Sequence, residues 1–156
     1  MQILTAEELA ELIISCKAGM YRVAYSIAGN DADAQDAVGD TIVRAYENLH
    51  KLRKKESAKS WLMQILVNSS KNIVKKKSKW TLLDNEMEEL EDHHAFQSDL
   101  MWPLVMELSE EFRMVVALYY YEQFSVHEIS RLLKISEGTV KSRLSRGREK
   151  LSKLLE

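Results

Sequence analysis

One stretch near the C-terminus combines cations with short hydroxylated side chains, in a pattern suited to a DNA groove. Its candidate contact residues are Thr139, Lys141, Ser142, Arg143, Ser145 and Arg146, with Arg148 on the same predicted face. Arginine can donate two hydrogen bonds to guanine or hold a phosphate, and small side chains let the backbone approach the bases. The pattern predicts contact with double-stranded DNA; the alternative is an ordinary helical hairpin with a solvated face.

A second stripe mixes an aromatic residue, two amides and two lysines at alternating spacings of three and four residues. Its members are Trp61, Gln64, Asn68, Lys71 and Lys75. This spacing places them on one face of a helix. An aromatic ring can stack on an unpaired base, amides can read base edges, and lysines neutralise phosphates. From the residues alone, a core tryptophan beside a soluble helix end explains the stripe equally well.

Metal chemistry is the third possibility, because His93 and His94 stand beside Glu91 and Asp92. Adjacent residues of a helix point about 100° apart, and no second ligand set is spaced to close a site. Cys16, the single cysteine, falls on an apolar face and is interpreted as a core residue. We therefore expect no catalytic residue, no metal, no cofactor and no small-molecule substrate.

Helices must position these candidates. Ser125 with Glu128 forms a capping box, and Ser136 caps a second helix after a turn of about three residues. Two short helices joined in this way predict a helix-turn-helix. A supporting helix is expected over 110–121, with Tyr119 and Tyr120 in its core.

Three longer helices are predicted in the N-terminal half, over about 6–28, 31–49 and 57–77, with a polar loop over 50–56 that contains Lys54 and Lys55. The polar face of the second helix carries Asp36, Gly39, Asp40, Val43 and Arg44. This face suits partner docking, although a solvated face with one exposed valine needs no partner.

Composition supports an all-α, cytoplasmic protein. The 156 residues include one proline and five glycines, too few turn formers for an all-β fold, and the N-terminal segment lacks the pattern of a secretory signal. Residues 1–80, 81–111 and 112–156 carry net charges of +4, −10 and +4. Two basic blocks around an acidic one predict nucleic-acid surfaces joined by a linker. We expect small helical domains over 1–80 and 99–156, with a flexible acidic linker over 81–98.

Two sets of motifs resemble one family. Residues 128–151, above all Gly138-Thr139-Val140-Lys141-Ser142-Arg143-Leu144, are similar to the fourth conserved region of extracytoplasmic-function sigma factors of bacterial RNA polymerase. The second conserved region is matched by Tyr21–Tyr25, Asp36–Thr41, Lys59–Leu62 and Ile65–Asn68. Order and spacing agree over nearly the whole chain, whereas the acidic linker has no recognisable counterpart.

The resemblance implies a role for each candidate surface. Asp36, Gly39, Asp40, Val43 and Arg44 would dock on the clamp helices of the largest polymerase subunit. Lys54, Lys55, Trp61, Gln64, Asn68, Lys71 and Lys75 would engage the minus-ten element and hold a base pulled from the stack. The helix-turn-helix would read the minus-thirty-five element in the major groove. The expected partners are core RNA polymerase, promoter DNA and an anti-sigma factor, which in this family is often membrane-anchored.

Departures from the family pattern leave some contacts open. Lys134 occupies a turn position where many relatives have glycine, and Gly39 replaces a longer polar residue on the docking face. A left-handed backbone at Lys134 would cost about 1 kcal/mol. The remaining alternative function is a stand-alone helix-turn-helix regulator, which should protect promoter DNA without polymerase, whereas a sigma factor should not.

Overall fold

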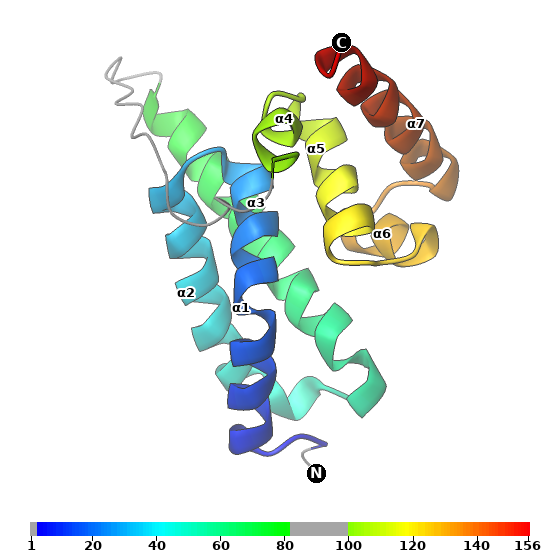
Figure 1. Cartoon of the computed structure of the whole chain (residues 1–156). Helices are drawn as coiled ribbons and strands as arrows, with labels where there is room; N and C mark the ends of the chain where they lie inside the picture. Colours follow the sequence, from blue (N-terminus) through cyan, green and yellow to red (C-terminus); the bar gives the residue numbers. More distant parts are fainter. Residues whose placement is uncertain (1–2, 82–99) are drawn as a thin grey trace. The chain divides into compact units, whose positions relative to one another are not determined.

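The computed structural model describes residues 3–81 and 100–156, except for the side chains of residues 79–81. Within these residues every regular element is helical (Figure 1). They separate into two compact units, one within Met1–Leu90 and one within Glu91–Glu156. The predicted all-α class with two small helical units is confirmed. His93, His94 and all of the predicted acidic linker except Thr81 lie outside the described residues.

The N-terminal unit consists of three long helices, α1 (Ala6–Ala28), α2 (Asp31–Glu47) and α3 (Ala58–Thr81) (Figure 1). A capping box starts α1, because the Thr5 side chain accepts from the Glu8 N–H while Glu8 accepts from the Thr5 N–H. Gly29, with φ 80°, ends α1, and the Asn30 side chain caps α2. The sequence therefore encodes a tight antiparallel turn between α1 and α2.

Small residues on the inner face of α2 let its neighbours pack closely; they are Ala34, Ala37, Val38, Thr41 and Ala45. Against them lie larger apolar side chains, among them Leu9, Met20 and Ile27 of α1 and Leu62, Met63 and Leu66 of α3. The sequence pattern of α3 predicts an inner face made by Ala58, Leu62, Ile65, Leu66, Ser69 and Ile73, and this prediction was partly wrong. Ile65 and Ile73 are only half-buried, and Met63 and Val67 are buried in their place.

Two short 3₁₀ turns, η1 (Leu49–Lys51) and η2 (Lys55–Ser57), form the connection between α2 and α3. Leu49 and Leu52 are buried and anchor this loop to the core. Its lysines, Lys54 and Lys55, are therefore left at the surface.

The C-terminal unit begins with α4 (Trp102–Met106) and α5 (Glu110–Val116), and continues into a π-helical turn, η3 (Ala117–Tyr121). In this turn the Glu122 N–H donates to the Ala117 carbonyl over 3.1 Å. The wider turn changes which side chains face inward. Tyr119 and Tyr120 are 37% and 47% exposed, so their predicted place in the core was wrong.

The helix-turn-helix is formed by α6 (Val126–Leu133) and α7 (Glu137–Leu154). The predicted capping box of Ser125 and Glu128 is confirmed, and Ser136 accepts from the Thr139 N–H. The sequence pattern predicts seven inward apolar residues in these two helices. Ile129, Leu132 and Leu133 of α6 and Val140, Leu144 and Leu151 of α7 are buried, whereas the seventh, Val126, is only half-buried. Gly147 lets α7 approach α5, because a Cβ atom on it would lie 3.0 Å from Cγ2 of Val116.

Candidate nucleic-acid interface

The first half of α7 presents cations and hydroxyl groups to solvent. Lys141, Ser142, Ser145 and Arg146 are exposed. Within the described parts of the chain, neither Lys141 nor Arg146 forms an ion pair or a side-chain hydrogen bond. Both cations are therefore free to meet an external anion or a base edge.

Three other predicted residues of α7 have partners inside the unit. The Thr139 hydroxyl lies 2.8 Å from that of Ser136, and Thr139 is half-buried. Arg143 leans toward α5, with Nη2 3.9 Å from Oε2 of Glu111. Arg148 donates to the Tyr120 hydroxyl over 3.0 Å and lines an apolar groove. The structure thus groups four of the six candidates on one open face and turns Thr139 and Arg143 partly inward.

The turn between α6 and α7 is made by a residue in an unfavourable conformation. Lys134 has φ 58° and ψ 46°, and its N–H donates to the Ser130 carbonyl. The left-handed backbone expected at this position is confirmed. It holds α7 against α6 at a cost of about 1 kcal/mol relative to glycine.

The α3 stripe borders a small polar pocket. Gln64 donates to Oδ1 of Asn68 over 3.1 Å, and both residues lie on the same side of the helix as the half-buried Trp61. The pocket has a volume of about 210 Å³ and is lined by Arg44, Asn48, Lys51, Trp61, Ile65, Asn68, Ser69 and Asn72. The buried Ser69 hydroxyl has no hydrogen-bond partner within the described residues. Lys71 and Lys75 continue the stripe at the surface.

The loop lysines differ in their surroundings. Nζ of Lys55 lies 2.8 Å from Oε2 of Glu8, which joins the loop to the start of α1. The hydrogen bond from Lys55 lowers the pKa of the Glu8 carboxyl, and the same pairing raises the pKa of the Lys55 ammonium group. Lys54 is exposed and forms no ion pair among the residues that the structure describes.

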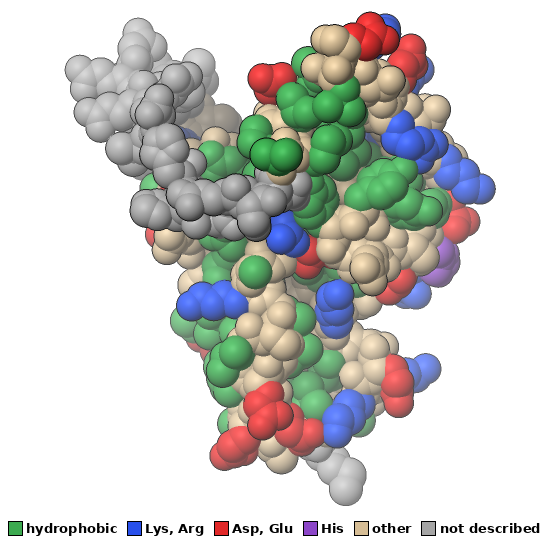
Figure 2. All heavy atoms as spheres, in the orientation of Figure 1, with side chains coloured by type: hydrophobic (Ala, Val, Ile, Leu, Met, Phe, Trp, Pro, Cys, Tyr) green, Lys and Arg blue, Asp and Glu red, His purple; other side chains and the backbone are tan. Residues whose placement is uncertain are grey.

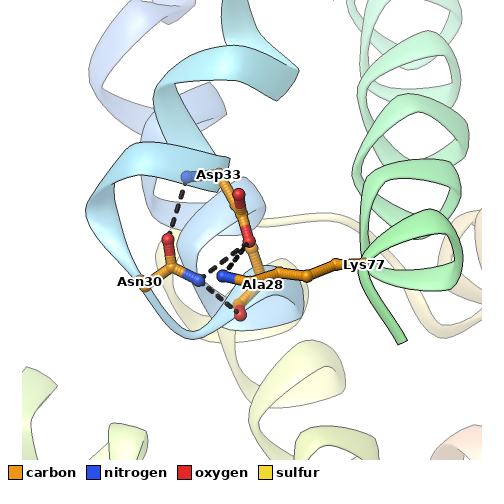
Figure 3. A network of polar contacts seen from close by, with 4 residues as sticks. All are labelled: Ala28, Asn30, Asp33 and Lys77. Carbon is orange, nitrogen blue, oxygen red and sulfur yellow. Dashed lines mark hydrogen bonds and ion pairs between the residues drawn. The ribbon is translucent and has the colours of Figure 1, made fainter. Parts of the chain in front are cut away.

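Sequence reasoning missed a polar network at the end of α3. Lys77 reaches from α3 to Asp33 of α2, with a 3.0 Å contact to Oδ2 (Figure 3). The same oxygen accepts from Nδ2 of Asn30 over 2.9 Å, and the Asn30 amide caps α2 through the Asp33 N–H. Asp33 is only 15% exposed in its side chain. Lys77 therefore ties two helices together, whereas Lys75 and Lys76 remain exposed.

The candidate docking face of α2 is open to solvent. Asp36, Gly39, Val43 and Arg44 are exposed, and Asp40 is half-buried. Nε of Arg44 donates to Oδ2 of Asp40 over 2.8 Å, as expected for residues four apart on a helix. The pair leaves Val43 as an apolar position between charged neighbours.

A larger apolar groove lies within the C-terminal unit. It has a volume of about 600 Å³ and is lined by Met101, Val105, Val116, Tyr120, Tyr121, Arg148, Leu151, Ser152 and Leu155. Figure 2 shows hydrophobic side chains gathered over α4 and beside the last turns of α7. Sequence reasoning missed this groove, because one of the tyrosines that line it, Tyr120, was assigned to the core.

Comparison with known proteins decides the family. Residues 12–80 match the family model for sigma-70 region 2, and residues 100–151 match that for sigma-70 region 4. The RNA polymerase sigma factor SigV of Bacillus subtilis is 31% identical over 86% of this chain and 86% of its own length. The chain belongs to the extracytoplasmic-function group of RNA polymerase sigma factors. It is thus a factor that directs transcription, in a family of initiation factors rather than catalytic enzymes.

Similarity to two further sigma factors supports the same family. The extracytoplasmic-function sigma factor SigW of Bacillus subtilis is 28% identical over 96% of this chain and 89% of its own length. The fold resembles that of the sigma factor RpoE in its complex with the anti-sigma factor NepR from Bartonella quintana. That likeness has a TM-score of 0.84 at 24% identity, over 96% of this chain and 98% of the other. The sigma factor fold therefore spans nearly the whole chain.

The described residues lack two further features. None of the helices there is both long enough and apolar enough to cross a membrane. No group of three metal-ligating side chains is found in residues 3–81 or 100–156, and the His93-His94 pair lies outside these ranges.

Proposed function

We propose that this sigma factor gives core RNA polymerase a promoter specificity through three separate surfaces. The region 4 unit reads the minus-thirty-five element, the α3 stripe and its loop open the minus-ten element, and the α2 face docks on the clamp helices of the largest polymerase subunit. The factor would act in the cytoplasm, with the two domains over 1–80 and 99–156 joined by the acidic linker over 81–98.

The minus-thirty-five assignment rests on α7, which carries the observation that supports the proposal most strongly. Lys141 and Arg146 stand exposed on the second helix of a capped helix-turn-helix, and neither has an ion pair within residues 3–81 or 100–156. Ser142 and Ser145 lie between them and are short enough to let the helix enter a major groove. Arg146 would read a base, and Arg143, drawn toward Glu111, would contact the backbone of the DNA.

The minus-ten assignment rests on the pocket beside α3. Trp61 offers an aromatic surface, Asn68 an amide, and Ser69 a hydroxyl with no hydrogen-bond partner in the described part of the chain, all lining a space of about 210 Å³. An unstacked base needs such an aromatic and polar surround to compensate for leaving the duplex. Lys54, Lys55, Lys71 and Lys75 would contact the phosphates of the opened strand.

An anti-sigma partner is the third element of the proposal. Two solved structures with a similar fold are complexes, one of RpoE with NepR and one of CnrH with the cytosolic domain of CnrY. In this chain an apolar groove of about 600 Å³ is open beside α7. We assign it to an apolar segment of an anti-sigma factor, because exposed patches of this kind mark binding sites.

Substitutions in the groove distinguish binding of an anti-sigma factor from binding of the polymerase. Tyr120→Glu with Leu155→Glu should raise transcription from the cognate promoter in cells without the inducing signal. Run-off transcription with purified polymerase should stay unchanged. A loss of run-off transcription in the purified system would assign the groove to the polymerase instead.

Run-off transcription from a promoter library tests the proposed function as a whole. Core polymerase with this protein should select promoters that share a pair of elements, and core alone should select none. A double variant, Lys141→Ala with Arg146→Ala, should lose selection at the minus-thirty-five element. No enrichment with the wild-type protein would refute the proposal.

A further inference from the structure

The exposed face of α2 contains a glycine that the fold of this unit does not require. Gly39 lies in the middle of the helix, and a Cβ atom built on it meets no neighbouring atom of the described residues within 4 Å. Its backbone is ordinary helix, since Gly29 is the glycine with positive φ among the described residues. Glycine weakens a helix interior relative to alanine. Neither packing nor backbone conformation in the unit explains its presence.

Gly39 is the first of three residues that lie on one face of α2. Val43 follows four residues later and Tyr46 three residues after that, so all three share one face of α2. Val43 is 56% exposed and Tyr46 42% exposed. A notch without a side chain, followed by two exposed apolar side chains, is the surface that one helix offers to another. Asp36 borders this line and has no ion pair among the described residues, whereas Asp40 is paired with Arg44 over 2.8 Å. The carboxylate of Asp36 therefore favours a cation on the partner.

We propose that the polymerase helix that docks on α2 comes closest to this chain at Gly39, where one of its side chains fills the notch. Val43 and Tyr46 pack against the apolar side of that helix, and a cation of that helix faces Asp36. The inference rests on the proposed docking role of α2. It adds Tyr46 to the surface and makes Gly39 the position of closest approach, in place of the long polar contact that is usual in the family.

The test compares binding affinity with stability for the full-length chain. Gly39→Ala should raise the melting temperature by roughly 2–8 °C, because the fold has room for the methyl group. The same variant should bind core polymerase at least about fivefold more weakly, because the methyl group occupies the notch. Gly39→Gln should bind more weakly still. Gly138→Ala, the same change at an exposed position of α7, is the matched control and should leave core affinity unchanged.

Three results would overturn the inference. Gly39→Gln could bind more tightly than wild type, which would mean that the glycine marks a lost contact. Gly39→Ala could bind with wild-type affinity, which would mean that no group approaches the notch. Gly39→Ala could lower the melting temperature, which would mean that the fold itself needs the glycine. The double variant Asp40→Lys with Val43→Glu distinguishes failure of this inference from failure of the proposed docking role. If the double variant loses core affinity while both Gly39 variants retain it, α2 is the docking face but Gly39 is not the position of closest approach.

Discussion

The two units of this sigma factor differ in the carboxylate partners of several surface cations. In the N-terminal unit Arg44, Lys55 and Lys77 each lie within 3.0 Å of a carboxylate oxygen. On α7, Lys141 and Arg146 have no such partner among the described residues. Cations that are already paired fix the geometry of a surface, whereas free cations are available to a ligand. Arg44, Lys55 and Lys77 therefore help to hold the N-terminal helices and loop in place, whereas Lys141 and Arg146 of α7 are available to a ligand.

The largest expected effect is a loss of core polymerase affinity when the α2 face is changed. Asp40→Lys with Val43→Glu breaks the Asp40–Arg44 pair and places a charge at the apolar position of the α2 face. Like charges across an interface cost several kcal/mol, so core affinity should fall by about 30-fold or more. Quantitative pull-down of core polymerase measures this, with circular dichroism to verify the helical fold. Retained affinity would remove the docking assignment.

A smaller effect should follow loss of one free cation on α7. Arg146→Ala should lose about 1–3 kcal/mol of discrimination at one or two positions of the minus-thirty-five element. Lys153 lies two turns further on and contacts Glu149 over 3.7 Å, so Lys153→Ala should leave that preference unchanged. Transcription from a saturation library of the element reports both variants. A uniform loss with Arg146→Ala would make Arg146 a phosphate contact only.

Strand opening should depend on the pocket beside α3. Asn68→Ala removes an amide at its rim and should weaken opening by about 0.5–1.5 kcal/mol, with little change in closed-complex formation. Permanganate reactivity of promoter thymines measures opening. Lys76→Ala is the control, because Lys76 is exposed but lies outside the stripe. Equal reactivity in Asn68→Ala and wild type would make the stripe a structural feature.

The turn of the helix-turn-helix allows a stabilising change. Lys134→Gly should raise stability by about 1 kcal/mol, because glycine adopts φ 58° without strain. Gln123→Gly, at φ 63°, should act in the same direction. Lys141→Gly, within the exposed part of α7, should instead lower stability by about 1 kcal/mol. Thermal unfolding compares the three; a loss of stability in Lys134→Gly would show that the lysine side chain stabilises the turn.

The smallest effect concerns the contact between Glu8 and Lys55. Glu8→Gln keeps the capping box of α1, since glutamine also caps at this position, but removes the ion pair to the loop. Because the pKa of Glu8 is lowered from 4.5 in the fold, the carboxylate stabilises the unit above that value and ceases to do so as the pH falls through the lowered pKa.

The difference between Glu8→Gln and wild type should therefore be visible near neutral pH and absent in strongly acid solution. For Lys55, with its raised pKa, the contribution is lost only as the pH rises through that pKa, in strongly alkaline solution. Glu7→Gln removes the same charge from the same helical turn and is the control. Thermal melts as a function of pH compare the variants; a pH-independent difference would assign the effect to capping.

Local rules predicted most of the helices and their caps. The capping boxes at Thr5 and Ser125 each join residues three apart in sequence, so short-range spacing is enough to identify both. The box at Ser125 and the cap at Ser136 were predicted, whereas the box at Thr5 was missed. Errors arose where a helix departs from its usual period. The π turn η3 rotates Tyr119 and Tyr120 out of the core, and no local signal predicts it.

Partners distant in sequence could not be predicted. The contacts of Lys55 with Glu8 and Lys77 with Asp33 span 47 and 44 residues and depend on how the helices pack. The same holds for Arg143 and Arg148, whose direction is set by Glu111 and Tyr120. A helical pattern predicts the face on which a residue lies. It does not predict which carboxylate or hydroxyl group its side chain will contact.

Footprinting of one cognate promoter with and without core polymerase tests the central claim most directly. The protein with core should protect both promoter elements and make thymines near the minus-ten element reactive to permanganate. The protein alone, at the same concentration and salt, should protect neither. Strong protection by the protein alone would contradict the account, because it would mean that the free cations of α7 suffice for binding and that the chain acts as a stand-alone regulator.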